Sequence, residues 1–196
     1  MSIDLKIRNN SACKKILVVG VFHGDEPQGE FFINEFLKLP KRCPKNSLYF
    51  VARLNSSNTR KNKNGVDLNR NFPTKNWILG ENDEYFGGTH PKSEEETKFL
   101  VDLIEDNKFD AIITIHAPYK IVNFDGPANE LAQKISQIVG YPVQEDIGYP
   151  TPGSFGTYCG VERQIPTITI EIDENKTPEE LLERFVELFY FLEEEY

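Results

Sequence analysis

The sequence has few of the features that mark several large classes of protein. It contains three cysteines among 196 residues, an odd and small number that cannot form a disulfide framework and suits a reducing compartment. No apolar run approaches the roughly 18 residues that a membrane-spanning helix needs. We therefore expect neither a membrane protein nor a small secreted domain stabilised by disulfides.

Basic charge is also scarce. Lys and Arg number 22 against 31 Asp and Glu, which gives a net charge of -9 at pH 7. Broad binding to nucleic acid requires the opposite balance, so we expect no nucleic-acid partner. The first dozen residues lack the apolar stretch of a secretory signal, and together these absences predict a cytoplasmic protein.

What the sequence does contain is an alternation of strand and helix patterns. Segments rich in β-branched and apolar residues predict strands at 15–22, 47–52, 111–115 and 167–172. Amphipathic segments predict helices at 30–37, from 93 onward, at 131–139 and from 177 onward. This alternation is typical of an α/β sheet with helices on both faces, and the length predicts one domain over residues 1–196.

Residues at the expected helix ends support these boundaries. Ser93 with Glu96, and Thr177 with Glu180, have the spacing of a capping box. Pro178 fits the first helical position after Thr177. Gly140 is a plausible C-cap for the helix at 131–139.

Polar residues follow the predicted strands at the ends where α/β sheets gather ligands. His23 and Glu26 come directly after the first strand, and His116 ends the strand at 111–115. Zinc accepts imidazole nitrogen and carboxylate oxygen, and catalytic zinc sites use three such ligands. Taken alone, this spacing also fits a loop histidine beside a helix-capping glutamate. His90 is the competing third histidine, but it lies in a turn, and we assign it no role.

Glu171 is a carboxylate in an otherwise apolar strand. Burial without a partner would be costly, so this side chain is either exposed at a sheet edge or placed in a cleft. In a cleft beside an activated water, it can act as a general base.

The polar loop at 60–73 carries two arginines and an aspartate. The planar guanidinium groups of Arg60 and Arg70 can clamp a carboxylate or stabilise a developing oxyanion. Asp67 can accept the second ring N–H of a ligand histidine. By composition alone, a solvated basic loop is the simpler interpretation.

The order of these motifs resembles the zinc carboxypeptidase superfamily of the carboxypeptidase A type. Its signature is HxxE, an arginine followed by G-x-D-x-N-R-N, a strand-terminal histidine and a strand glutamate, and this chain has all four. The resemblance implies a three-layer sandwich with a mixed, mostly parallel sheet. It also implies an enzyme, a zinc metallohydrolase with one Zn²⁺ per chain. The implied metal ligands are His23, Glu26 and His116.

Further roles follow from the same resemblance, residue by residue. Glu171 corresponds to the general acid/base, and Arg60 to the group that polarises the scissile carbonyl and holds the oxyanion. The residues implied to bind the substrate are Asn69 and Arg70, which would grip its terminal carboxylate, and Tyr149, which would cap it. Asp67 corresponds to the residue that orients His23.

Longer segments are similar to one branch of the family, the murein peptide amidases. They lie at 23–26, 65–73, 93–97, 115–118 and 148–156. This branch hydrolyses the γ-D-glutamyl–meso-diaminopimelate bond of small peptides released from the cell wall, which implies a cytoplasmic recycling role. Three alternatives stay open: a carboxypeptidase acting on another bond of such peptides, an N-deacylase of the aspartoacylase or desuccinylase type, and a non-catalytic peptide-binding module.

Two surface features have open interpretations. Glu145 and Asp146 are candidates to bind the diaminopimelate ammonium, although a solvated acidic turn is the favoured interpretation. The aromatic residues Phe185, Phe189 and Phe191 of the last helix could form a homodimer interface. Their helical spacing favours core packing instead.

Overall fold

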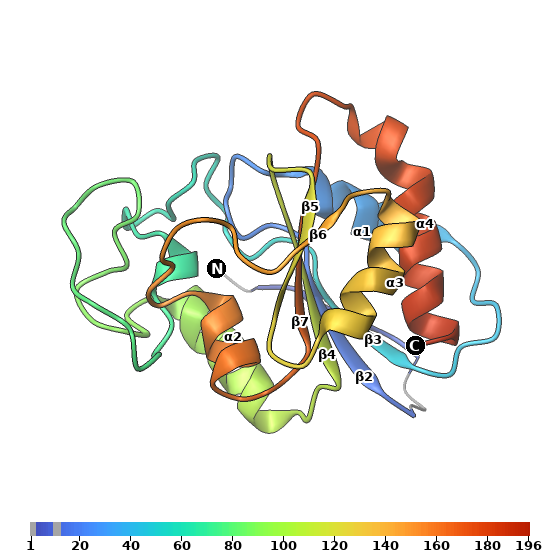
Figure 1. The fold of residues 1–196 in the computed structure, drawn as a ribbon, viewed down its shortest axis with the longest axis horizontal. Coiled ribbons are helices and arrows are strands. Elements are labelled where there is room, and N and C mark those ends of the chain that lie inside the picture. Colours follow the sequence, from blue (N-terminus) through green and yellow to red (C-terminus); the bar gives the residue numbers. More distant parts are fainter. Residues whose placement is uncertain (1–2, 10–12) are drawn as a thin grey trace.

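The computed structural model describes residues 3–9 and 13–196, and within them a seven-stranded sheet has the order β1-β3-β2-β4-β7-β5-β6 (Figure 1). The strands are β1 (Leu5–Arg8), β2 (Lys15–Val19), β3 (Ser47–Val51), β4 (Ala111–His116), β5 (Ile121–Asp125), β6 (Val143–Gln144) and β7 (Thr167–Glu171). The strands β2, β3, β4 and β7 pair in parallel, and β5 and β6 pair in parallel with each other. β1 pairs antiparallel with β3, and β5 antiparallel with β7. The sheet is therefore mixed and mostly parallel, as expected, whereas β1, β5 and β6 were not predicted.

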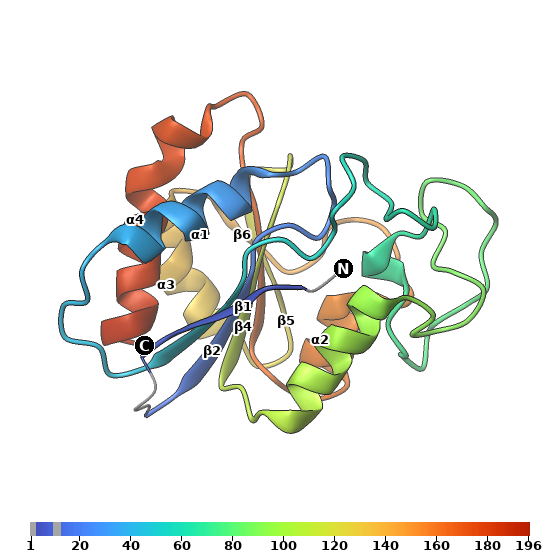
Figure 2. The ribbon, with the colours of Figure 1, turned by 180° about the vertical axis from the view of Figure 1, so that it is seen from behind.

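Helices cover both faces of this sheet. They are α1 (Gln28–Lys38), α2 (Glu95–Asp106), α3 (Asn129–Val139) and α4 (Pro178–Glu194), with a short 3₁₀ helix η1 (Leu68–Arg70) and a π-helix η2 (Thr157–Val161). α1, α3 and α4 lie on one face, and α2 and η2 lie on the other (Figures 1 and 2). The three-layer arrangement predicted from the sequence is confirmed.

The face under α1, α3 and α4 holds the larger apolar core. Phe32 of α1 stacks on Phe185 of α4 with ring centroids 4.1 Å apart. Phe189 is buried in the same cluster, and Phe191 packs against it from a partly buried position. These aromatic side chains are thus used for packing within the chain, which agrees with the interpretation that their helical spacing favoured.

The predicted caps are correct for two helices and wrong for one. Thr177 and Glu180 form both hydrogen bonds of the capping box that begins α4, and Gly140 ends α3 with φ of 76°. The capping box predicted at Ser93 is wrong, because α2 has Glu94 as its N-cap residue, without a side-chain cap. The Ser93 hydroxyl instead donates to Glu94 Oε1 at 2.7 Å and accepts from Asn71 at 2.9 Å, so it is not available to the first turn.

The parallel strands bring three sequence-distant segments to one edge of the sheet. β4 and β7 end side by side, with His116 paired in register to Glu171. The loop after β2 reaches the same edge and carries His23 and Glu26. Among the described residues, no helix has both the length and the apolar character needed to cross a bilayer.

Candidate metal centre

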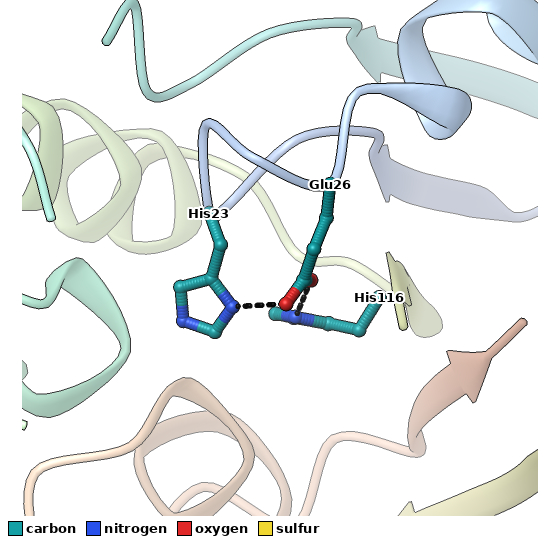
Figure 3. Close-up of side chains that lie close together, drawn as sticks. All are labelled: His23, Glu26 and His116. Carbon is teal, nitrogen blue, oxygen red and sulfur yellow. Dashed lines mark hydrogen bonds and ion pairs between the residues drawn. The ribbon is translucent and has the colours of Figure 1, made fainter. Parts of the chain in front are cut away.

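Three side chains converge at this edge. His23, Glu26 and His116 each offer a ligand atom, and these atoms lie within 4.8 Å of one another. His23 Nδ1 is 3.0 Å from Glu26 Oε1, and His116 Nδ1 is 3.0 Å from Glu26 Oε2 (Figure 3). Both imidazole rings are only 3% exposed. The structure therefore brings together the three residues that the sequence predicted as metal ligands.

The chemistry of this donor set fits a zinc ion. Two imidazole nitrogens and one carboxylate oxygen are zinc ligands, and three protein ligands leave a further position open. The two rings present the same atom, Nδ1, toward the Glu26 carboxylate. These polar groups come from the loop after β2 and from the end of β4, and their convergence is what a metal site requires.

Asp67 contacts both a candidate metal ligand, His23, and Arg60. Its Oδ1 lies 3.2 Å from His23 Nε2 and accepts the Asn69 backbone N–H at 2.9 Å. Its Oδ2 accepts two hydrogen bonds from Arg60, at 3.1 and 3.0 Å. Burial raises the pKa of Asp67, but the opposing effect of His23 and Arg60 is larger and brings the pKa down to about 2. This carboxylate is thus charged and holds both the His23 ring and the Arg60 guanidinium in place.

The neighbouring charges set the protonation of the cluster. Burial lowers the pKa of His23, but Asp67 and Glu26 raise it more, to about 9. Burial also raises the pKa of Glu26, and the two histidines hold it well below its ordinary value. The Glu26 carboxylate is therefore ionised, as a metal ligand must be, and His23 carries a proton that a metal ion would displace.

Glu171 lies next to this cluster with an unused oxygen. Its side chain is 8% exposed, and within the described part of the chain Oε2 is buried without a hydrogen-bond partner. Burial raises its pKa above the ordinary carboxyl value. A poorly solvated carboxylate of raised pKa is suited to accept and return a proton near neutral pH.

Two arginines line the opposite wall of the cleft. Arg70 is 6% exposed, and its Nη1 donates to the Asn69 carbonyl at 2.7 Å. Over residues 3–9 and 13–196, no carboxylate forms an ion pair with it, whereas Arg60 is paired with Asp67. A buried cation without an acidic partner points to an anionic ligand. Asn69 accepts the Phe155 backbone N–H through Oδ1, which leaves its amide NH₂ as a donor.

Two tyrosines complete the cleft. Tyr149 lines it from the loop after β6, and burial together with Tyr119 raises the pKa of its hydroxyl to about 12. Tyr85 was not predicted, and its ring lies 5.0 Å from the Arg60 guanidinium carbon and 5.5 Å from that of Arg70. It comes from the loop between η1 and α2, where no local pattern marks it.

The remaining histidine and the acidic turn lie elsewhere. His90 is exposed, and its ring contacts Thr89 rather than the cluster. Glu145 and Asp146 are exposed and do not line the cleft, as the solvated-turn interpretation expects. The cleft has a volume of about 160 Å³, and its lining includes Asn123, Asp125, Ser154, Gly156 and Thr169 in addition to the residues above. Asn123, Asp125 and Thr169 belong to no motif, and Ser154 and Gly156 lie in the segment 148–156, where sequence reasoning assigned a role to Tyr149 alone.

A buried His–Glu–His cluster beside a cleft with an unpaired glutamate and two arginines defines the class of zinc metallohydrolases. Comparison with known proteins specifies the family. The family model described as zinc carboxypeptidase matches residues 49–134. Murein peptide amidase A of Vibrio campbellii is 34% identical over 192 residues, which cover 88% of this chain and 76% of that protein. The chain belongs to the zinc carboxypeptidase family.

Two further relatives agree with this assignment, and a third protein shares the fold. Murein peptide amidase A of Escherichia coli K12 is 37% identical over 112 residues, covering 51% of this chain and 46% of that protein. The crystal structure of murein-tripeptide amidase from Escherichia coli O157 superposes with a TM-score of 0.83 at 28% identity, covering 94% of this chain and 84% of that one. Thrombin activatable fibrinolysis inhibitor, with a TM-score of 0.76 at 18% identity over 95% of this chain and 62% of its own, shares the fold.

Proposed function

We propose that this protein hydrolyses the γ-D-glutamyl–meso-diaminopimelate bond of small murein peptides. One observation carries the proposal. A single cleft holds the His23–Glu26–His116 cluster, the Glu171 carboxylate with its Oε2 unpartnered, and the buried Arg70 guanidinium, which forms no ion pair among the described residues. The similarity to murein peptide amidases supports the choice of substrate. A cytoplasmic place in the recycling of cell-wall peptides belongs to the same proposal.

Substrate binding begins at Arg70 and Asn69. In a peptide that ends in diaminopimelate, the residue on the leaving side of the scissile amide carries a free α-carboxylate. The buried Arg70 guanidinium lacks a carboxylate partner within the described residues, and the Asn69 NH₂ is a free donor beside it. Together they can bind this carboxylate with charge-assisted hydrogen bonds. This anchor places the amide bond between Glu171 and Arg60.

The reaction then needs a base, an oxyanion donor and a metal. His23, Glu26 and His116 would hold the zinc ion, which would supply a Lewis acid able to activate a water and polarise the carbonyl. Glu171 takes a proton from the attacking water and returns it to the leaving amine of diaminopimelate. Arg60, fixed by Asp67, donates to the oxygen that gains negative charge as the tetrahedral intermediate forms.

Tyr149 contributes from the open side of the cleft. Tyr149 lines the cleft and is 38% exposed. Its hydroxyl stays protonated at neutral pH because its pKa is about 12. We propose that it caps the bound peptide as a hydrogen-bond donor.

The first experiment incubates the zinc-loaded protein with L-Ala-γ-D-Glu-meso-diaminopimelate and measures free diaminopimelate. The expected result is release that a chelator abolishes and that added zinc restores. No release from a folded, zinc-loaded sample would overturn the proposed bond. Assays on tetrapeptides and on N-acyl amino acids would then separate the carboxypeptidase and deacylase alternatives.

A further inference from the structure

The cleft extends from Glu171 along the face of the sheet that lies under η2. β5 runs antiparallel to β7, with Ile121 opposite Glu171, Asn123 opposite Thr169 and Asp125 opposite Thr167. Alternate residues of a strand share a face, and Asn123 and Asp125 line the same cleft as Glu171. The cleft wall therefore ends in a second carboxylate, that of Asp125, which the proposed reaction does not use.

Asp125 has no counter-charge in its surroundings. It is half-buried, and among the described residues its carboxylate forms no hydrogen bond and no ion pair. Two glycines make room for it: a Cβ on Gly156 would overlap the carboxylate, and a Cβ on Gly160 would overlap the Asp125 Cβ and backbone. Burial raises its pKa. The Asp125 carboxylate thus packs against two glycines but has no polar partner among the described residues. A partly buried charge in this situation favours a ligand of opposite charge.

We propose that Asp125 is a specificity-determining residue that binds an ammonium group at the far end of the leaving residue's side chain. The inference deepens the proposed function and rests on it for the identity of that residue, diaminopimelate. Asp125 lies four residues along β5 from the position opposite Glu171, so the far end of a long side chain is placed closer to it than the scissile amide is. The far end of diaminopimelate carries such an ammonium.

This assignment also explains the distribution of charge in the cleft. Arg70 and Arg60 line the cleft, and Arg60 is joined through Asp67 to His23 of the metal cluster. The α-carboxylate and the scissile carbonyl would be bound there. Asp125 lies at the other end of the cleft wall, beyond Asn123 and Thr169. Diaminopimelate has its α-carboxylate near the amide bond, and its far end carries an ammonium beside a second carboxylate. In this assignment, Asp125 contacts the ammonium alone. Glu145 and Asp146, the candidates suggested by sequence alone, are exposed and cannot provide this contact.

A purely structural role makes a different prediction. Asp125 packs against Gly156, which precedes the first residue of η2, and a negative charge near a helix start can stabilise it. If that were its role, loss of the charge would lower stability and reduce turnover of all substrates by the same factor. The ammonium-binding role instead requires a selective effect.

The test compares two peptides that differ only in this ammonium. L-Ala-γ-D-Glu is joined to meso-diaminopimelate in one and to L-2-aminopimelate in the other. Because a hydrogen bond to a charged group is worth about 1.5–3 kcal/mol, we expect wild type to prefer the diaminopimelate peptide by roughly 10- to 100-fold in kcat/KM. Asp125→Asn should lose that preference and leave kcat/KM for the aminopimelate peptide within about threefold. Glu145→Gln, an exposed acid nearby, should keep it.

Binding of the free amino acids separates this inference from the proposed function. The affinities of meso-diaminopimelate and L-2-aminopimelate for the zinc-loaded protein are measured by calorimetry, with zinc content and thermal unfolding as controls. Wild type could cleave neither peptide and still bind diaminopimelate more tightly than aminopimelate. If Asp125→Asn then lacks this difference in affinity, the proposed bond is wrong and the role of Asp125 stands. Equal binding of both by wild type, or an equal loss for both peptides in Asp125→Asn, overturns the role of Asp125. If Asp125→Asn does not fold, Asp125→Ser is measured in the same way.

Discussion

The two faces of the central sheet differ in character, although the same strands form both. In β4, Ile113 and Ile115 belong to the apolar cluster under α1, α3 and α4. Thr114 and His116 of the same strand face the other side, where His116 joins the metal cluster. β7 repeats the pattern, with Ile168 and Ile170 in the core and Thr169 and Glu171 in the cleft. Because side chains alternate along a strand, successive residues of β4 and β7 point to the apolar core and to the cleft in turn.

This division predicts that the two faces respond to substitution in different ways. Changes under α1, α3 and α4 should lower stability and leave the chemistry of the folded protein intact. The other face has a smaller apolar cluster under α2, but changes at the polar residues that line the cleft should lower activity and leave stability nearly unchanged. Each experiment below tests one side of this contrast.

The largest effect is expected at Glu171. Glu171→Gln removes the proton acceptor without changing the shape of the side chain, and kcat should fall by roughly 10²- to 10⁴-fold. Zinc content and unfolding temperature should match wild type. Glu183→Gln, at an exposed position of α4, is the matched control. Substantial turnover by zinc-loaded Glu171→Gln would remove Glu171 from the mechanism.

On the apolar face, Phe185→Ala should act through stability alone. The Phe185 ring is 1% exposed and stacks on Phe32. Its loss leaves a cavity, and the free energy of unfolding should fall by about 3–5 kcal/mol. Denaturant titration measures this change, and kcat per folded, zinc-loaded molecule should stay within about twofold of wild type. A large fall in kcat with little change in stability would contradict the division between the faces.

At Arg60, truncation to alanine should lower kcat by roughly 100- to 1000-fold, because the oxyanion loses a positioned donor. Arg53→Ala is the control, since Arg53 pairs with Glu30 and lies outside the cleft. Steady-state kinetics on the tripeptide separates kcat from KM. An increase in KM alone would indicate that Arg60 binds substrate without stabilising the transition state.

A smaller effect is expected at the start of α4, the long helix on the apolar face. Thr177→Ala removes the side-chain acceptor of the capping box and should lower the free energy of unfolding by about 1 kcal/mol. Thr177→Ser keeps an acceptor and should retain most of the stability. If both variants were equally destabilised, the loss would come from the threonine methyl group rather than from the cap.

Acidification should weaken metal binding. Because the pKa of His23 is raised to about 9, the ring is protonated at neutral pH before the metal binds, and zinc must displace that proton. For one displaced proton, the apparent affinity should fall by about tenfold per pH unit as the pH is lowered from 8 to 6. Zinc titration against a calibrated competitor at each pH checks this, and a pH-independent affinity would contradict it.

Local patterns in the sequence were sufficient for the features that depend on neighbouring residues. The capping box at Thr177 needs residues three positions apart, and the apolar strands need only composition and length, so both were predicted. His23, Glu26 and His116 were candidate ligands because parallel strands end at one edge of a sheet. The resemblance to the zinc carboxypeptidases was needed to distinguish them from a loop histidine beside a capping glutamate.

Other features depend on contacts between distant segments and could not be predicted in this way. Ser93 has the spacing of a cap, but Asn71, from the preceding loop, takes its hydroxyl. Tyr85 reaches Arg60 and Arg70 only through the path of a long loop. The face on which Asp125 lies depends on the antiparallel register of β5 with β7, and a five-residue strand without strict alternation does not reveal it.

The shared carboxylate of Asp67 restricts the routes by which this enzyme can be redesigned. One side chain serves the His23 imidazole and the Arg60 guanidinium at once. Under the proposed mechanism, a change at position 67 would alter metal retention and oxyanion stabilisation together, and selection for one property would change the other. Directed evolution toward another metal would have to begin at a different residue, or first supply Arg60 with a new partner.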